Sequence, residues 1–111
     1  MSHSVLFLDH AEYDLRNIHA HVESQFSEIL ANQVYIAIRD AILRLEKNPN
    51  LGRAIPELSK LGMTDYRCLV VEKRNKVVYQ IDAGKKHVYI HLICGERQDF
   101  EMALAQRLLE T

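Results

Sequence analysis

Apolar positions in the first half of the chain recur at the spacing of helices. A short apolar run at residues 5–8 comes first, and two long amphipathic stretches follow it. Their apolar residues recur at helical steps, at Ala11, Leu15, Ile18, Val22 and Phe26 and then at Leu30, Val34, Ala37, Ile38, Ala41 and Leu45. This period predicts a strand followed by two helices, at about residues 9–27 and 27–48, that form a hairpin with a very short turn.

Polar residues predict where the helices begin. Asp9 and Glu12 have the D-x-x-E spacing of a capping box, so we expect the strand to pass directly into the first helix. Ser27 is the predicted N-cap of the second helix. Apolar residues after Asp99 again keep helical spacing, so we predict a last helix over residues 99–110 with Asp99 as its N-cap.

The second half of the chain has the pattern of β-strands. Residues 66–72, 76–82 and 87–94 are rich in Val, Ile, Leu and Tyr, and short connections between them are typical of antiparallel hairpins. Alternation in the last two segments predicts one apolar face in each, formed by Val77, Tyr79 and Ile81 and by Val88, Ile90, Leu92 and Cys94. Residues 49–65 have no clear period and are expected to form an ordered loop.

These elements together predict an α+β fold of order β-α-α-β-β-β-α. The two-helix hairpin would pack on a small, mainly antiparallel sheet whose last three strands form a meander. A chain of 111 residues supports a single domain, residues 1–111, with one core. We expect that core to contain Leu15, Ile18, Val22, Val34, Ile38, Leu45, Val77, Tyr79, Ile81, Val88, Ile90 and Leu92.

Composition excludes several classes of protein. With 14 Lys and Arg against 15 Asp and Glu, the formal charge of -1 lacks the strong positive field of a general nucleic-acid binder. The apolar runs are too short to cross a bilayer and the start has no signal-peptide pattern, so we expect a cytoplasmic protein without a membrane partner. Cys68 and Cys94 lie in apolar strands and are expected to be buried free thiols. Neither histidine spacing nor any known motif indicates a metal or a cofactor.

Two surfaces are candidates for binding a partner. Residues 60–97 hold eight Lys and Arg against four Asp and Glu, so the sheet could present a basic surface to RNA, DNA or an acidic peptide. Lysines at hairpin turns could equally serve solubility and edge protection, so the stronger candidates are Arg67, Lys76 and Arg97, at or near strand ends. The second helix also carries surplus apolar residues, including Tyr35 and Ile36, which would pack in the core or against a partner chain.

The order of elements and several short motifs resemble one known family. The segment Leu-Glu-Lys-Asn-Pro-Asn-Leu-Gly-Arg at residues 45–53 is the most specific, and Pro-Glu-Leu at 56–58 follows it. Tyr66-Arg67, the strand at 77–81 and the Glu-Arg-Gln-Asp sequence at 96–99 come after these in the same register. Together they are similar to the ParE branch of the RelE/ParE superfamily of bacterial toxins, which includes plasmid stabilisation proteins.

The resemblance implies a toxin of a type II toxin–antitoxin pair with a RelE/ParE-like fold. Such a toxin forms a hetero-oligomer with a cognate, ParD-like antitoxin, whose C-terminal segment wraps and neutralises it. ParE-like members act on DNA gyrase and block replication, whereas RelE-like members are ribosome-dependent mRNA endonucleases. An inactive homologue and a toxin with another target are further alternatives.

Residues matched to the family favour gyrase as the target. In a RelE-like nuclease the catalytic residues would be Arg67, Lys76 and Arg97, but Leu69 stands where a second strand lysine is expected. Phe100 lies roughly where that mechanism has a tyrosine, and phenylalanine cannot move a proton. In a gyrase-directed toxin the target-binding residues would be Arg97 and Phe100. The resemblance also implies antitoxin binding at Tyr35, Ile36 and Arg67.

Overall fold

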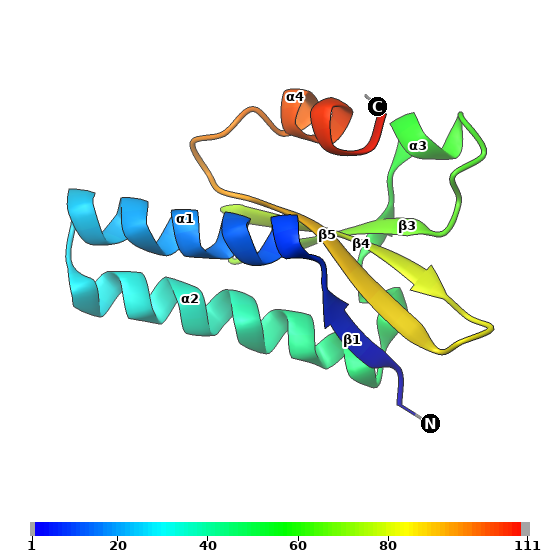
Figure 1. The fold of residues 1–111 in the computed structure, drawn as a ribbon, viewed down its shortest axis with the longest axis horizontal. Coiled ribbons are helices and arrows are strands. Elements are labelled where there is room, and N and C mark those ends of the chain that lie inside the picture. Colours follow the sequence, from blue (N-terminus) through cyan, green and yellow to red (C-terminus); the bar gives the residue numbers. More distant parts are fainter. Residues whose placement is uncertain (1, 110–111) are drawn as a thin grey trace.

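The computed structural model describes residues 2–109 as helices on both faces of one sheet (Figure 1). The elements in chain order are β1 (Ser4–Phe7), α1 (Asp9–Gln25), α2 (Glu28–Leu43), the 3₁₀ turns η1 (Arg44–Glu46) and η2 (Pro49–Leu51), β2 (Arg53–Ala54), α3 (Pro56–Ser59), β3 (Tyr66–Val71), β4 (Asn75–Asp82), β5 (His87–Cys94), α4 (Phe100–Leu104) and the π-helical segment η3 (Ala105–Leu109). The hairpin of α1 and α2 covers one face of the sheet, and α3 and α4 lie on the other.

The sheet has the strand order β1-β5-β4-β3-β2. Only β1 runs parallel to its neighbour, β5, and the remaining pairs are antiparallel. The chain between these two parallel strands contains the helical hairpin and the three other strands. The predicted α+β fold, with its mainly antiparallel sheet and its meander of the last three strands, is therefore confirmed.

The caps of two helices are as predicted and that of the first is not. Ser27 Oγ accepts a hydrogen bond from Leu30 N at 3.1 Å, and Asp99 Oδ1 accepts one from Met102 N at 3.1 Å. The predicted capping box at Asp9 is wrong, because Leu8 is the N-cap of α1 and no side chain caps it. The amide of Leu8 still donates to Ile90 O at 3.1 Å, which keeps residue 8 extended and makes Asp9 the first helical residue.

The hairpin side of the sheet contains most of the predicted core. Its fully buried residues include Ile38, Leu45, Val77 and Ile90 at 0 % exposure. Val22, Val34 and Ile81 are partly buried and pack against this cluster. The core prediction is thus confirmed for every residue except Leu92, which lies on the other face of the sheet.

A β-bulge in β5 explains this exception. Tyr79 pairs with Ile90, and the preceding residue Val78 pairs with Leu92, so His91 is an extra residue with no partner in β4. One extra residue reverses the side to which all later residues point. The predicted strict alternation is therefore wrong beyond Ile90: Leu92 and Cys94 face α3 and α4, and Ile93 faces the hairpin.

A second buried cluster lies between the sheet and the helices α3 and α4. The predicted loop at residues 49–65 supplies part of it, since this segment contains η2, β2 and α3 and buries Leu58 completely. Cys68 and Cys94 are free, as predicted, and both pack in this cluster. Burial raises the pKa of the Cys68 thiol to about 11, so it stays protonated and unreactive near neutral pH.

Two isoleucines two residues apart on α2 test this packing. Ile38 is completely buried, so Ile38→Ala should lower the free energy of unfolding by about 2–5 kcal/mol. Ile36 is 45 % exposed, so Ile36→Ala should cost under about 0.5 kcal/mol. Chemical denaturation of both variants measures the difference, and equal costs would contradict the assigned face of α2.

Candidate functional site

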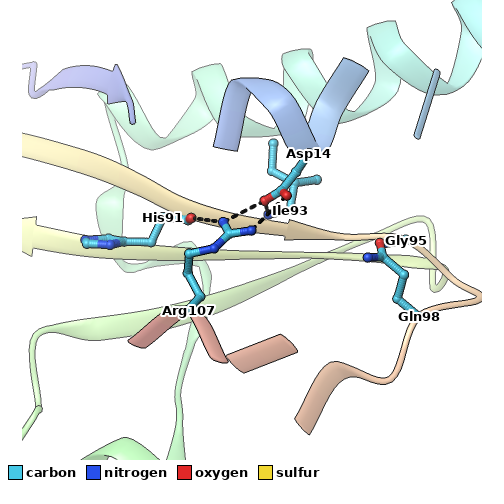
Figure 2. Close-up of polar contacts among 6 residues, drawn as sticks. All are labelled: Asp14, His91, Ile93, Gly95, Gln98 and Arg107. Atoms are coloured by element: carbon cyan, nitrogen blue, oxygen red, sulfur yellow. Dashed lines mark hydrogen bonds and ion pairs between the residues drawn. The ribbon is translucent and has the colours of Figure 1, made fainter. Parts of the chain in front are cut away.

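Asp14 and Arg107 tie three elements together at the β-bulge (Figure 2). Arg107 Nη1 and Nη2 each donate to a different carboxylate oxygen of Asp14 at 2.9 Å. Arg107 Nη1 also donates to His91 O at 2.7 Å, and Asp14 Oδ2 accepts from Ile93 N at 3.0 Å. The two side chains thus satisfy backbone groups of β5 around the bulge, where β1 no longer runs beside this strand.

Sequence reasoning missed this pair, although one signal was present. Asp14 is three residues after Ala11 and four before Ile18, so it lies on the apolar side of α1, where a carboxylate needs a partner. Nothing in the sequence pointed to Arg107 as that partner, because the two residues are 93 positions apart.

The loop between β5 and α4 is fixed at both ends. Gly95 N donates to Gln98 Oε1 at 2.7 Å, as Figure 2 shows, and Asp99 caps α4. Arg97 lies between these two contacts, and its side chain is exposed. No ion pair holds Arg97 within residues 2–109, so its guanidinium is available to a carboxylate or phosphate.

Lys76 and Phe100 lie together on the face of the sheet that α4 covers. Lys76 Nζ is 4.5 Å from the centre of the Phe100 ring, which is cation–π geometry. Phe100 also packs against the second buried cluster, so only part of its ring is exposed. A positive charge is therefore held beside the start of α4.

Arg67 lies on the opposite face of the sheet. It pairs with Tyr79, whose side chain faces the hairpin. Arg67 Nη1 donates to Gly52 O at 2.6 Å, and the Tyr79 hydroxyl donates to Pro49 O at 2.6 Å and accepts from Gly52 N at 2.8 Å. The structure thus does not bring Arg67 together with Lys76.

This network explains the specific sequence around Gly52. A Cβ atom on Gly52 would lie 2.8 Å from both Cys68 O and the Tyr79 hydroxyl, so only glycine fits there. Burial raises the pKa of Tyr79, which keeps its hydroxyl protonated as a donor. Arg67 and Tyr79 therefore fix the Pro49–Gly52 segment.

Tyr35 and Ile36 lie on the outer side of the helical hairpin. The ring of Tyr35 meets that of His19 edge-on at 6.3 Å, and His19 Nε2 is 2.8 Å from Asn32 Oδ1. Two shallow hollows of about 440 and 430 Å³ adjoin here and share Arg16 and Tyr35. The solvent side of the hairpin is thus grooved.

A further hollow of about 550 Å³, which we call the tip hollow, lies at the turn end of the hairpin. It is lined from α1 and its C-cap by Asp14, Asn17, Ile18, His21, Val22 and Phe26, from α2 by Leu30 and Val34, and from the strand connections by Arg74, Asn75 and Gly95–Gln98. Of the predicted site residues, it contains Arg97 alone. Its other members come from four distant segments, so no local pattern could have found them.

His91 and Gln80 form a polar cluster on the α4 side of the sheet. His91 Nε2 is 3.0 Å from Gln80 Oε1, and Gln80 Nε2 donates to Asp65 Oδ2 at 2.7 Å. The ring of Tyr66 packs against His91 at 5.1 Å. Burial lowers the pKa of His91, the charge of Asp65 opposes this shift, and the charge of Arg107 adds a smaller lowering. His91 is therefore uncharged near neutral pH.

Two other kinds of site have no candidates among residues 2–109. Within residues 2–109, no group of three or more His, Cys, Asp or Glu side chains could hold a metal ion. No helix in the same residues is long and apolar enough to cross a membrane.

Comparison with known proteins identifies the family. Residues 5–100 match the model of the ParE toxin of the type II toxin–antitoxin system parDE. The chain belongs to the ParE toxin family. No curated protein sequence gives a significant match. This ParE-family chain is thus a type II toxin by sequence family, and the structural comparisons bear on its fold.

Solved toxins share the fold of this ParE-family chain at low sequence identity. The chromosomal ParDE system of P. aeruginosa matches with a TM-score of 0.69 and 19% identity, over 85% of this chain and 96% of that one. The RelBE toxin–antitoxin complex of Mycobacterium tuberculosis matches with 0.64 and 16%, over 86% and 99%. A mutant of the E. coli toxin RelE in the free state matches with 0.60 and 15%, over 97% and 100%. The expected RelE/ParE-like fold is confirmed.

The ion pair at the bulge can be tested by removing Arg107. The side chains of Arg107 and Asp14 are only 25% and 11% exposed, so Arg107→Ala leaves a carboxylate and a carbonyl unsatisfied. We expect a loss of about 1–3 kcal/mol of unfolding free energy and faster amide exchange in α4. Arg39→Ala is the control, because the Arg39–Asp40 pair is 47% and 52% exposed and should contribute under about 1 kcal/mol. Equal losses in the two variants would contradict this role of Arg107.

The half-buried His91 of this ParE-family chain predicts a loss of stability in acid. The pKa of His91 is lower in the folded chain than its ordinary value of 6.5, so the unfolded chain takes up a proton first as the pH falls. Stability from this group is complete above the ordinary pKa and decreases as the pH drops through it towards the folded value. Denaturation from about pH 8 to about pH 5 should therefore show a larger loss for the wild type than for His91→Gln. Identical pH dependence would contradict the burial of a neutral His91.

Proposed function

We propose that this toxin inhibits DNA gyrase and does not itself cleave RNA. The observation that carries the proposal is the separation of the candidate cations. A ribonuclease needs several cations and an acid–base group around one phosphate. Arg67 instead binds Gly52 on the hairpin side of the sheet, while Lys76 stacks on Phe100 on the other side.

Arg97 and Phe100 are the proposed target-binding residues. Arg97 is exposed on a loop fixed by Gly95 and Asp99, so it can bind an acidic or phosphate group at little cost in entropy. Phe100 lies three residues further along and offers aromatic contact area without a proton to transfer. This combination suits binding of a macromolecular target more than chemistry on it.

A cognate, ParD-like antitoxin is the proposed partner, and Tyr35, Ile36 and Arg67 are its proposed contacts. The grooved outer side of the hairpin supports Tyr35, which lines both hollows, because an amphipathic segment could lay apolar side chains there. Ile36 lines neither hollow, and its support is its exposure on the same helix. Exposed apolar residues recur on α2 at steps of seven, at Ile29, Ile36 and Leu43. Arg67 would contribute through guanidinium N–H groups that Gly52 does not use.

One observation favours the alternative, a RelE-like ribosome-dependent mRNA endonuclease. Arg74 and Arg97 line the same hollow, so two cations could meet one phosphate there. His21 lines the same hollow, and its imidazole could transfer a proton in place of the missing tyrosine. We therefore retain this function as the second candidate.

Inducing the chain alone in a susceptible bacterium tests the proposal. Growth should stop, with DNA replication failing before translation, and purified toxin should inhibit supercoiling by gyrase or trap cleaved DNA. Arg97→Ala should weaken this inhibition about tenfold or more, because a charge-assisted contact is lost.

Arg44→Ala is a matched control, since Arg44 is also exposed but lies at the far end of α2. It should leave inhibition unchanged. Unaffected gyrase, together with codon-phased mRNA cuts that disappear in Arg67→Ala or Arg97→Ala, would assign the chain to the nuclease branch instead.

A further inference from the structure

The solvent side of α2 carries a row of large apolar side chains. Ile29, Ile36 and Leu43, which we call the α2 ridge, are 74 %, 45 % and 42 % exposed. Ile36 is two residues from the fully buried Ile38, a rotation of about 200° around the helix, so the ridge points away from the core. Figure 1 shows α2 at the edge of the molecule. The face of a surface helix opposite the core is normally polar, so packing within residues 2–109 does not account for the ridge.

Helical geometry makes the ridge nearly straight. Its members recur at steps of seven residues, and seven residues rotate by about 700°, within about 20° of two full turns. The row therefore runs almost along the helix axis, with the slight drift of a coiled-coil seam. Such rows pack against a second helix at a crossing angle of about 20°. The shape of the ridge thus fits another helix.

The α2 ridge is symmetric about Ile36. Ile29 precedes this residue and Leu43 follows it, each by seven residues. When the α2 helix of a second copy lies antiparallel across the ridge, Ile36 meets its own counterpart and Ile29 meets Leu43 at both ends. A two-fold dimer requires a self-complementary patch of this kind, whereas an unrelated partner imposes no symmetry on the face that it binds.

The polar residues beside the ridge repeat this symmetry. Asn32 and Arg39 lie on one side of it and Gln33 and Asp40 on the other, since each is three or four residues from Ile36. In the antiparallel pair, Arg39 faces Asn32 of the second copy, and Asp40 faces Gln33 of the second copy. A carboxamide accepts from a guanidinium and donates to a carboxylate, so each charge meets a group that can bind it. Within one chain the two charges form only an exposed pair with each other, which contributes little.

We propose that the free toxin forms a two-fold dimer through the α2 ridge, with the α2 helices of the two copies antiparallel. The dimer does not depend on which cellular target the toxin has. Because Ile36 is also a proposed antitoxin contact, the dimer is a state of the toxin without its antitoxin. A single pair of helices is smaller than the roughly 20–30 residues a side of a stable interface, so we expect reversible association with a dissociation constant of about 1 μM or above.

The concentration dependence of the molecular mass tests the dimer. In sedimentation equilibrium of the purified full chain, the mass should rise from that of one chain towards that of two between about 1 and about 200 μM. Ile36→Lys places two like charges at the two-fold axis, so it should weaken association about tenfold or more. Ile36 is exposed, so this variant should still fold.

Met102→Lys is the matched control for the added charge. Met102 is an exposed apolar residue of α4, 58 % exposed, and lies outside the α2 ridge. This variant should associate within about twofold of the wild type.

Disulfide trapping tests the antiparallel register. A cysteine at position 36 lies beside its own counterpart, so mild oxidation of Ile36→Cys should give covalent dimers. The two copies of a cysteine at position 29 would be about 21 Å apart, so Ile29→Cys should link only when it is mixed with Leu43→Cys. The native Cys68 and Cys94 pack in the second buried cluster, so the wild type should stay unlinked.

The outcomes separate the dimer from the proposed function. A wild type that stays monomeric throughout, or an Ile36→Lys variant that associates as well as the wild type, would overturn the dimer. Self-linking of Ile29→Cys as efficient as that of Ile36→Cys would indicate parallel helices and overturn the arrangement. If the chain is monomeric and the small protein encoded beside the toxin gene shields a cysteine at position 36 from alkylation, the ridge belongs to that partner instead. Dimerisation together with unaffected gyrase would support the dimer and contradict the proposed function alone.

Discussion

The contact between Asp14 and Arg107 is the constraint on which the rest of the arrangement depends. The bulge at His91 gives β5 an extra residue just where β1 ends, so backbone groups on this stretch lack a strand beside them. A carboxylate from α1 and a guanidinium from the C-terminal segment satisfy those groups and each other. The positions of α1, β5 and the C-terminal helix are thereby linked through a single half-buried ion pair.

The bulge also determines which residues can act together. It turns Leu92 and Cys94 towards α4, so the sheet acquires a second buried cluster and the C-terminal helix gains an apolar surface to pack on. Phe100 lies in that cluster and receives Lys76 above its ring. Arg67 lies across the sheet, where it fixes the Pro49–Gly52 segment. Arg67 therefore has a structural role. Arg97 instead lies exposed on the loop after β5.

Hollows lie on opposite sides of the helical hairpin. The outer groove near Tyr35 offers apolar contact to an amphipathic segment, and the tip hollow combines an apolar wall with two arginines. One disordered partner could reach both surfaces in an extended form, as chains that fold on binding commonly do.

The sequence by itself determined the order of the main helices and strands, most of the core and two of the three predicted caps, whereas it missed β2 and α3 in the predicted loop. These features depend on local periods and on residues such as Ser27 and Asp99, whose partners are three residues away. The tertiary structure alone decided the bulge, the Asp14–Arg107 contact and the faces on which Arg67 and Lys76 lie. Each of these depends on the pairing register of strands or on residues distant in the chain, and a one-residue shift of register leaves the local hydrophobic pattern almost unchanged while reversing every side chain beyond it.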